Sequence, residues 1–167
     1  MAIVSTEVAE RLRSGTFAAL AVFTASCAER MAQLFTGLRG DDAERAADIA
    51  TFLAILDELW DADLPATGFL SRVGELEGFD ELDRTADEEP LSEIDDIYSF
   101  NSVLCMRYAA LYRATQDPEE AVCSREPVRA LAVGPQHLTA RALRIRARVS
   151  AACCTRRLHI TVGDASD

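Results

Sequence analysis

The sequence predicts an all-α fold, a four- to five-helix bundle with an atypical Arg-rich C-terminal tail. The first reason is periodicity, because apolar residues recur at three- and four-residue steps over the long segments 17–38, 43–60 and 93–114. The second is local chemistry, since residues suited to helix capping precede several of the predicted helices. The third is composition: with 49% hydrophobic and 27% charged residues, a chain of 167 residues can bury one core.

The N-terminal part of the chain predicts a short helix and then a long one. Ser5 or Thr6 can cap a short amphipathic helix that stops at Gly15. The next helix is much stronger, because the segment from Phe17 to Leu38 keeps a single apolar stripe at helical spacing. We therefore expect the stripe of this second helix to lie in the core.

Two further helices are predicted before the chain becomes strongly acidic. Asp41, with Glu44 three residues later, forms a capping-box-like start for a helix that ends at Trp60. This helix and the preceding one read as an antiparallel hairpin. Thr67 can then open a shorter helix that reaches Leu76 and is weakened by two glycines.

Residues 75–96 are dominated by acidic side chains. This segment holds eleven acids and a single base, Arg84, so we expect much of it to be a solvated loop. Ser92 can cap the last strong helix, over residues 93–114, which keeps a helical stripe of apolar residues.

A further helix is expected to begin at Asp117. A capping Asp is followed there by Pro118 at the first helical position, which is a favourable helix start. Pro127 arrives within three turns, and proline disrupts the interior of a helix. The pattern therefore predicts that this helix lasts only to about Arg125.

The charge balance changes near the same point of the chain. Residues 1–120 hold 25 acids and 9 Arg, whereas residues 121–167 hold 3 acids and 8 Arg. We therefore predict an acidic helical-bundle domain over residues 1–122 and an Arg-rich tail over residues 123–167. The apolar pattern of the tail fits either a helix over 136–152 or a strand hairpin, and periodicity alone does not separate them.

One motif lies in the first long helix, in the segment FAALAVFTASCAERM at residues 17–31. Together with the amphipathic helix that ends in Leu59-Trp60, this segment resembles the uncharacterised YjaG-like family of small bacterial helical proteins, over about residues 15–122. The resemblance implies a compact helical bundle and brings no established activity. The motif residues that carry it are Cys27, Glu29, Arg30 and Trp60.

Local chemistry gives these motif residues structural interpretations. Cys27 would need a basic partner to become a nucleophile, and both histidines, His137 and His159, lie in the tail. We therefore expect Cys27 to be packed in the core. Glu29 and Arg30 lie near the edge of the apolar stripe, where charged residues usually pair with a neighbouring helix or extend to solvent.

Several classes of protein are disfavoured by the sequence. The N-terminus lacks the basic-then-apolar order of a secretory signal, and no apolar stretch is long enough to cross a bilayer. The five cysteines are odd in number, which favours reduced thiols and a cytoplasmic protein. The acidic bundle would repel phosphates, so we expect it to have no nucleic-acid partner. The Arg cluster of the tail could bind nucleic acid, but its simpler role is to fold back on the acidic face. No motif predicts a cofactor.

The function that the sequence favours is non-catalytic binding. An acidic face on a small cytoplasmic protein suits fast capture of a basic partner, and the sharpest form of this hypothesis is an immunity- or antitoxin-like role. The predicted partner-binding patch consists of Glu88, Glu89, Glu93, Asp95 and Asp96.

Two alternatives remain at this point. The first is a Mg-dependent nucleotide phosphohydrolase of the acidic helical type, since Mg²⁺ accepts a few carboxylates together with waters. Its candidate ligands are Asp57, Asp61, Glu93 and Asp96. The second is a helical bundle of unassigned housekeeping role, which the family resemblance favours.

Overall fold

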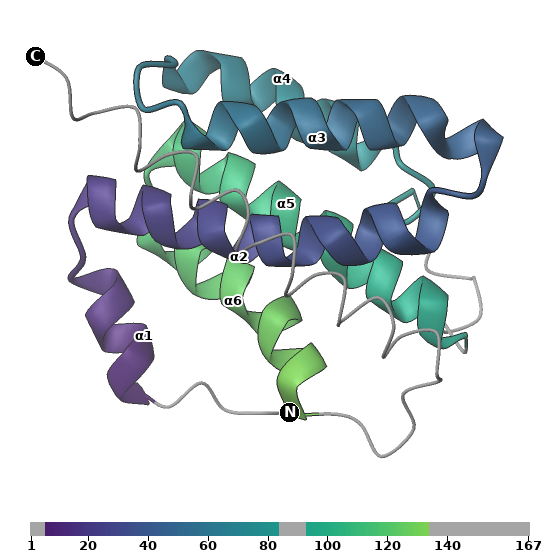
Figure 1. Ribbon diagram of the computed structural model, residues 1–167. Helices are drawn as coiled ribbons and strands as arrows, with labels where there is room; N and C mark the ends of the chain where they lie inside the picture. Colours follow the sequence, from purple (N-terminus) through teal and green to yellow (C-terminus); the bar gives the residue numbers. More distant parts are fainter. Residues whose placement is uncertain (1–5, 84–92, 134–167) are drawn as a thin grey trace, which may run out of the picture. The chain divides into compact units, whose positions relative to one another are not determined.

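The computed structural model describes residues 6–83 and 93–133, and the account that follows concerns these residues. Within them the chain is helical and contains no strand, so the all-α prediction is confirmed (Figure 1). The elements are α1 (Thr6–Arg13), α2 (Phe17–Arg39), the 3-10 turn η1 (Ala43–Arg45), α3 (Ala46–Trp60), α4 (Ala66–Glu77), α5 (Ile94–Thr115) and α6 (Pro118–Val133).

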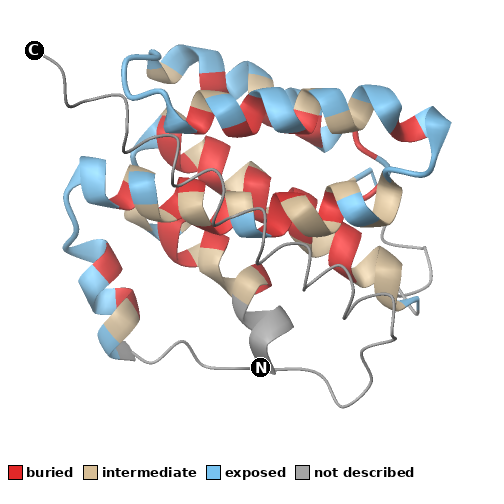
Figure 2. Cartoon of the chain, in the orientation of Figure 1, coloured by how far each residue is buried: buried red, intermediate tan, exposed pale blue. Residues whose placement is uncertain are grey.

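Helix α5 is the central element of the bundle. It packs against α2, α3, α4 and α6, and between Ile94 and Ala114 each of its residues is buried or half-buried (Figure 2). Small residues let neighbouring helices approach it on several sides, among them the fully buried Ala109 and Ala110. The hydroxyl of its buried Ser102 is hydrogen-bonded within the helix, because Ser102 Oγ donates to the Tyr98 carbonyl at 2.7 Å.

The main core lies where α2, α3, α4 and α5 meet. Phe35 of α2 stacks on Phe52 of α3 and on Phe79, with ring centroids 4.6 Å and 6.0 Å apart. Stacked rings at these separations add to the free energy that their burial contributes. The expected hairpin of α2 and α3 is thus closed by aromatic contacts, and Phe79 brings the chain after α4 into the same cluster.

The ends of α2 follow from local chemistry. Thr16 caps its beginning, because its hydroxyl accepts a hydrogen bond from the Ala19 amide. Gly40 closes its end, where a Cβ atom would lie 2.5 Å from the Thr36 carbonyl oxygen. The following cap is Asp42, which accepts from the Glu44 amide at 2.9 Å, so our prediction of Asp41 as the cap was wrong by one residue.

Helix α6 corrects the prediction for the end of the bundle. It begins as expected, with Asp117 accepting a hydrogen bond from the Glu119 amide, but it continues through Pro127 to Val133 instead of ending near Arg125. Pro127 is buried, so packing offsets the hydrogen bond that proline cannot donate.

Helix α6 runs to Val133, across the predicted boundary between residues 122 and 123. The helix predicted over 136–152 and the alternative hairpin, whose strand-like segments are residues 143–149 and 158–162, lie outside the described residues. Among the helices of the described part, none is both long enough and apolar enough to cross a membrane.

Candidate functional site

Part of the predicted partner-binding patch lies at the beginning of α5. Glu93 is exposed and stands at the N-cap position, and Asp95 and Asp96 are half-buried in the first turn. Carboxylates are favoured there by the helix dipole. Glu88 and Glu89 lie outside the described residues, so the structure neither adds them to the patch nor removes them.

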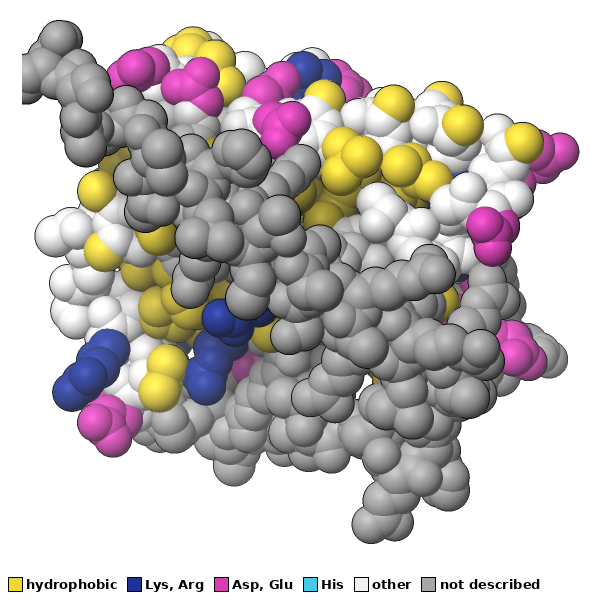
Figure 3. Space-filling view, in the orientation of Figure 1, with side chains coloured by type: hydrophobic (Ala, Val, Ile, Leu, Met, Phe, Trp, Pro, Cys, Tyr) yellow, Lys and Arg dark blue, Asp and Glu magenta, His cyan; other side chains and the backbone are white. Residues whose placement is uncertain are grey.

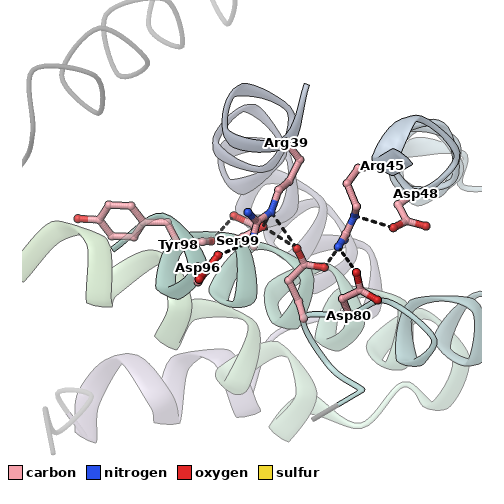
Figure 4. Close-up of polar contacts among 9 residues, drawn as sticks. Arg39, Arg45, Asp48, Asp80, Asp96, Tyr98 and Ser99 are labelled. Atoms are coloured by element: carbon pink, nitrogen blue, oxygen red, sulfur yellow. Dashed lines mark hydrogen bonds and ion pairs between the residues drawn. The ribbon is translucent and has the colours of Figure 1, made fainter. Parts of the chain in front are cut away.

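Asp96 belongs to a polar network that the sequence did not reveal. At its centre is Glu81, whose side chain is 3% exposed. One oxygen of Glu81 accepts hydrogen bonds from Arg39 Nε at 3.1 Å and from Ser99 Oγ at 2.8 Å, and the other accepts from Arg45. Arg39 also donates to Asp96 at 2.7 Å (Figure 4).

Arg45 connects the same network to α3. Its guanidinium lies 2.8 Å from a carboxylate oxygen of Asp48 and 2.7 Å from one of Asp80, in addition to its contact with Glu81 (Figure 4). The side chain is 10% exposed, so its charge needs these partners. The network therefore fixes the end of α2, η1, the start of α3, the chain after α4 and the start of α5 relative to one another.

Electrostatics keeps the centre of this network ionised. Burial alone would raise the pKa of Glu81, but hydrogen bonds from Arg45 and Ser99 and the charge of Arg45 outweigh it and lower that pKa. Burial would likewise lower the pKa of Arg39, and Asp96 and Glu81 together raise it instead. Both partners thus remain charged in the folded protein.

A cavity of about 340 Å³ opens beside the network. Five carboxylates and two guanidinium groups line it, so its net charge is negative. The lining residues are Arg39, Asp42, Glu44, Arg45, Asp80, Glu81, Asp96 and Phe100. Such a site favours a cation over an anion, because both arginines are already paired with carboxylates.

Around this cavity the surface is acidic. We call the group formed by Asp42, Glu44, Asp80, Asp83, Glu93 and Asp95 the acidic end. Acidic side chains are visible at the right of the space-filling view, where the α2–α3 connection lies (Figure 3). Within the described part of the chain, only Asp80 of this group makes an ion pair with an arginine.

A second buried arginine lies toward the other end of α5. Arg113 is 3% exposed and donates to the backbone carbonyls of Leu59 and Asp61, each at 2.8 Å, and of Leu64 at 3.4 Å. Its guanidinium also lies 4.7 Å from the centroid of the Phe69 ring. Arg113 therefore holds the end of α3 and the connection to α4, and burial lowers its pKa.

The proposed magnesium ligands are not brought together. Arg113 binds the backbone of Asp61 at the C-terminal part of α5, whereas Glu93 and Asp96 lie at the start of that helix. Asp96 and Arg113 are separated along α5 by about 25 Å at the helical rise of about 1.5 Å per residue. Asp57, Asp61, Glu93 and Asp96 therefore do not form one site, and the described residues contain no cluster of three or more possible metal ligands.

The family-motif residues do not converge either. Cys27 is buried beside Met31 and Cys105, and burial raises the pKa of its thiol to about 11, as expected of a core cysteine. Glu29 is half-buried and Arg30 is exposed; an ion pair of either with a neighbouring helix is not found within residues 6–83 and 93–133, and Arg30 instead extends to solvent. Trp60 is 44% exposed at the end of α3.

Comparisons with protein-family models, with curated proteins and with solved structures find no match. The resemblance to the YjaG-like family therefore stays a prediction.

Proposed function

We propose that this chain is a non-catalytic cytoplasmic binding protein that captures a basic partner at the acidic end, in the manner of an immunity protein or antitoxin. The proposal rests on one observation: the arginines of this region are paired with carboxylates, while several outer carboxylates are not paired within the described residues. Arg39 and Arg45 turn toward the buried Glu81, while the outer carboxylates Glu44, Asp83 and Asp95 make no ion pair within the described part of the chain. The charge left for a partner is negative.

Two further features support this function. The outer carboxylates stand on backbone segments that the buried ion pairs hold in place, so binding needs to order little backbone. The cavity of about 340 Å³ is large enough for the head of a partner's Arg or Lys side chain, and its lining is net negative. Long-range attraction between an acidic end and a basic partner also raises the association rate.

The proposed function is tested by removing charge at the acidic end. A double variant, Glu44→Gln with Asp80→Asn, neutralises two exposed carboxylates that line the cavity. A matched control, Glu7→Gln with Glu10→Gln, removes the same charge from the exposed surface of α1, which precedes the opposite end of α2. Binding of a fluorescent Arg-rich peptide is measured by anisotropy at low and at high salt.

We expect the variant at the acidic end to weaken peptide binding by about tenfold and to flatten its salt dependence, whereas the control changes it little. Equal weakening by both variants would mean that only the net charge of the protein attracts the peptide, and the acidic end would lose its role.

The structure gives no comparable support to the phosphohydrolase alternative, because its candidate ligands lie at both ends of α5. A housekeeping role of unassigned kind predicts no particular arrangement of residues at this site.

A further inference from the structure

The outer face of α3 is apolar and has no covering element within the described residues. Its exposed large side chains are Leu53, which is 37% exposed, and Trp60, which is 44% exposed. The remaining exposed positions of α3 are alanines apart from Asp57. We call this face, formed by Ala46, Ala47, Ala50, Leu53, Ala54 and Trp60, the α3 face. Hydrophobic side chains are visible over the upper right of the molecule, where α3 lies (Figure 3).

The α3 face is long enough for a docked helix. Helix α3 has 15 residues, which corresponds to a length of about 22 Å. Its exposed apolar positions recur at three- and four-residue steps, the pattern by which one helix packs along another. The spacing therefore fits the apolar side of a helix of about four turns.

Charge around the α3 face identifies the chemistry of the occupant. Residues 46–65 include five acids and no Arg or Lys; Asp48 and Glu58 are paired with Arg45 and Arg72, and the other three make no ion pair within the described part of the chain. Glu44 of the acidic end precedes the face, while Asp61 and Asp63 are exposed beyond its C-terminal end. An occupant with basic residues at both ends would find carboxylates at both ends.

The same charges disfavour a second copy of this chain. If two α3 helices pair in antiparallel orientation about Leu53, Asp63 of one copy lies nearly level with Glu44 of the other. A parallel pairing places like charges together directly. Acidic residues would then oppose acidic residues at both ends of either dimer, which costs free energy.

We propose that the α3 face is the docking surface for a basic amphipathic helix of the partner. Its apolar side packs on Leu53 and Trp60, and its Arg or Lys residues meet Glu44 at one end and Asp61 and Asp63 at the other. This inference rests on the proposed function, because it names the partner captured at the acidic end. The two surfaces are neighbours along the chain, since exposed Glu44 of the acidic end stands two residues before exposed Ala46, the first residue of the α3 face.

The protein contains its own reporter for this test. Trp60 is the only tryptophan of the chain, and burial under a docked helix shifts its fluorescence emission to shorter wavelength. The full-length protein is titrated with a designed helical peptide that carries a Leu/Ala face and Arg at its flanking positions. A scrambled peptide of the same composition has the same charge without the apolar face, and a third peptide replaces its Arg residues by Glu.

The matched variants are Leu53→Gln on the α3 face and Val22→Gln on α2. Both replace an exposed apolar residue by a neutral residue that suits a helix, so folding should be preserved in each. We expect Leu53→Gln to weaken binding of the basic amphipathic peptide by about fivefold while leaving its salt dependence unchanged. Val22→Gln should bind as the unmodified protein does.

Other results would overturn the inference, and some of them would still agree with the proposed function. If the scrambled peptide binds equally well, or if only Glu44→Gln with Asp80→Asn weakens binding, a basic partner is captured without use of the α3 face. If the Glu-containing peptide binds as tightly, the charge argument fails. If sedimentation shows self-association that Leu53→Gln abolishes, the occupant is a second copy.

Discussion

The two ends of α5 each bury an arginine, and they compensate its charge in different ways. At the N-terminal end, Arg45 is surrounded by the carboxylates of Glu81, Asp48 and Asp80. At the C-terminal end, Arg113 has backbone carbonyls and the face of Phe69 as its hydrogen-bond and cation–π partners. The first arrangement depends on ionised side chains, whereas the second uses the free carbonyls at the end of a helix.

The bundle can therefore respond to its surroundings at one end of α5 more than at the other. Backbone carbonyls do not titrate, so acid should affect the Arg113 end less than the Glu81 end, although the charge of Asp61 also acts on Arg113. The network around Glu81 carries net charge and borders a cavity, so protonation or a charged partner can act on it. The proposed binding site thus lies at the end whose stability depends on charge.

The largest effect should come from Glu81→Gln, which removes the central charge of the network. Two guanidinium groups would then lose their buried partner, and breaking a buried ion pair from one side costs about 3–5 kcal/mol. The free energy of unfolding in urea measures this. Asp80→Asn is the control, because that side chain is 84% exposed and should matter by less than about 1 kcal/mol.

A somewhat smaller loss is expected for Arg113→Ala at the other end. The carbonyls of Leu59 and Asp61 would lose a charged donor, at a cost of about 2–4 kcal/mol in the free energy of unfolding. Arg113→Lys should recover part of this lost free energy, because an ammonium group still donates to a carbonyl. The recovery should be incomplete, since Lys lacks the fixed geometry that lets Arg bind several carbonyls at once. Unfolding curves identical to those of the unmodified protein would show that the buried arginine does not secure the end of α3.

Lowering the pH should destabilise the bundle through the Glu81 end of α5 more than through the Arg113 end. The pKa of Glu81 lies below its usual range in the folded protein. Ionised Glu81 therefore contributes stability above its unfolded-state pKa of about 4.3, and this contribution is lost as pH falls through the lower folded-state pKa. Urea unfolding at a series of acidic pH values should show a shallower decline for Glu81→Gln, while Arg113→Ala keeps the slope of the unmodified protein. Parallel slopes for all three proteins would contradict this assignment.

The smallest effect is expected for Arg107→Ala. Its ion pair with Glu77 lies near the surface, with side chains 27% and 49% exposed. Pairs of this kind contribute less than about 1 kcal/mol. The same unfolding measurement sets the baseline for the two buried arginines, and a loss as large as that of Arg113→Ala would remove the distinction between exposed and buried sites.

The helices could be predicted from the sequence because their apolar periodicity is long and regular. Helix α2 was expected from Phe17 to Leu38 and ends at Arg39. Helix α6 runs past its predicted end near Arg125, because the buried packing of Pro127 offsets the disruption that proline causes in a helix interior.

The residues of the candidate site could be predicted less well from the sequence than the helices. Glu81 is one of eleven acids in residues 75–96, and nothing local marks it as the buried one. Its role depends on hydrogen bonds from Arg39 and Arg45, which are 42 and 36 residues away in sequence. The turn between α2 and α3 brings these two arginines to Glu81. Asp96 was predicted to face a partner, yet it pairs with Arg39. Long-range pairing of this kind leaves no periodic signal.

The central position of α5 has a consequence for how this sequence can change over time. Because the core-facing residues between Ile94 and Ala114 are buried, random replacement along this helix should be purged at those positions and tolerated at half-buried ones such as Arg107. The outer positions of α3 can vary freely unless a partner constrains them. A saturation library selected for folding alone should therefore show little variation at the buried positions of α5 and wide variation at the outer positions of α3, and invariance of Leu53 and Trp60 among natural relatives would then record binding instead of folding.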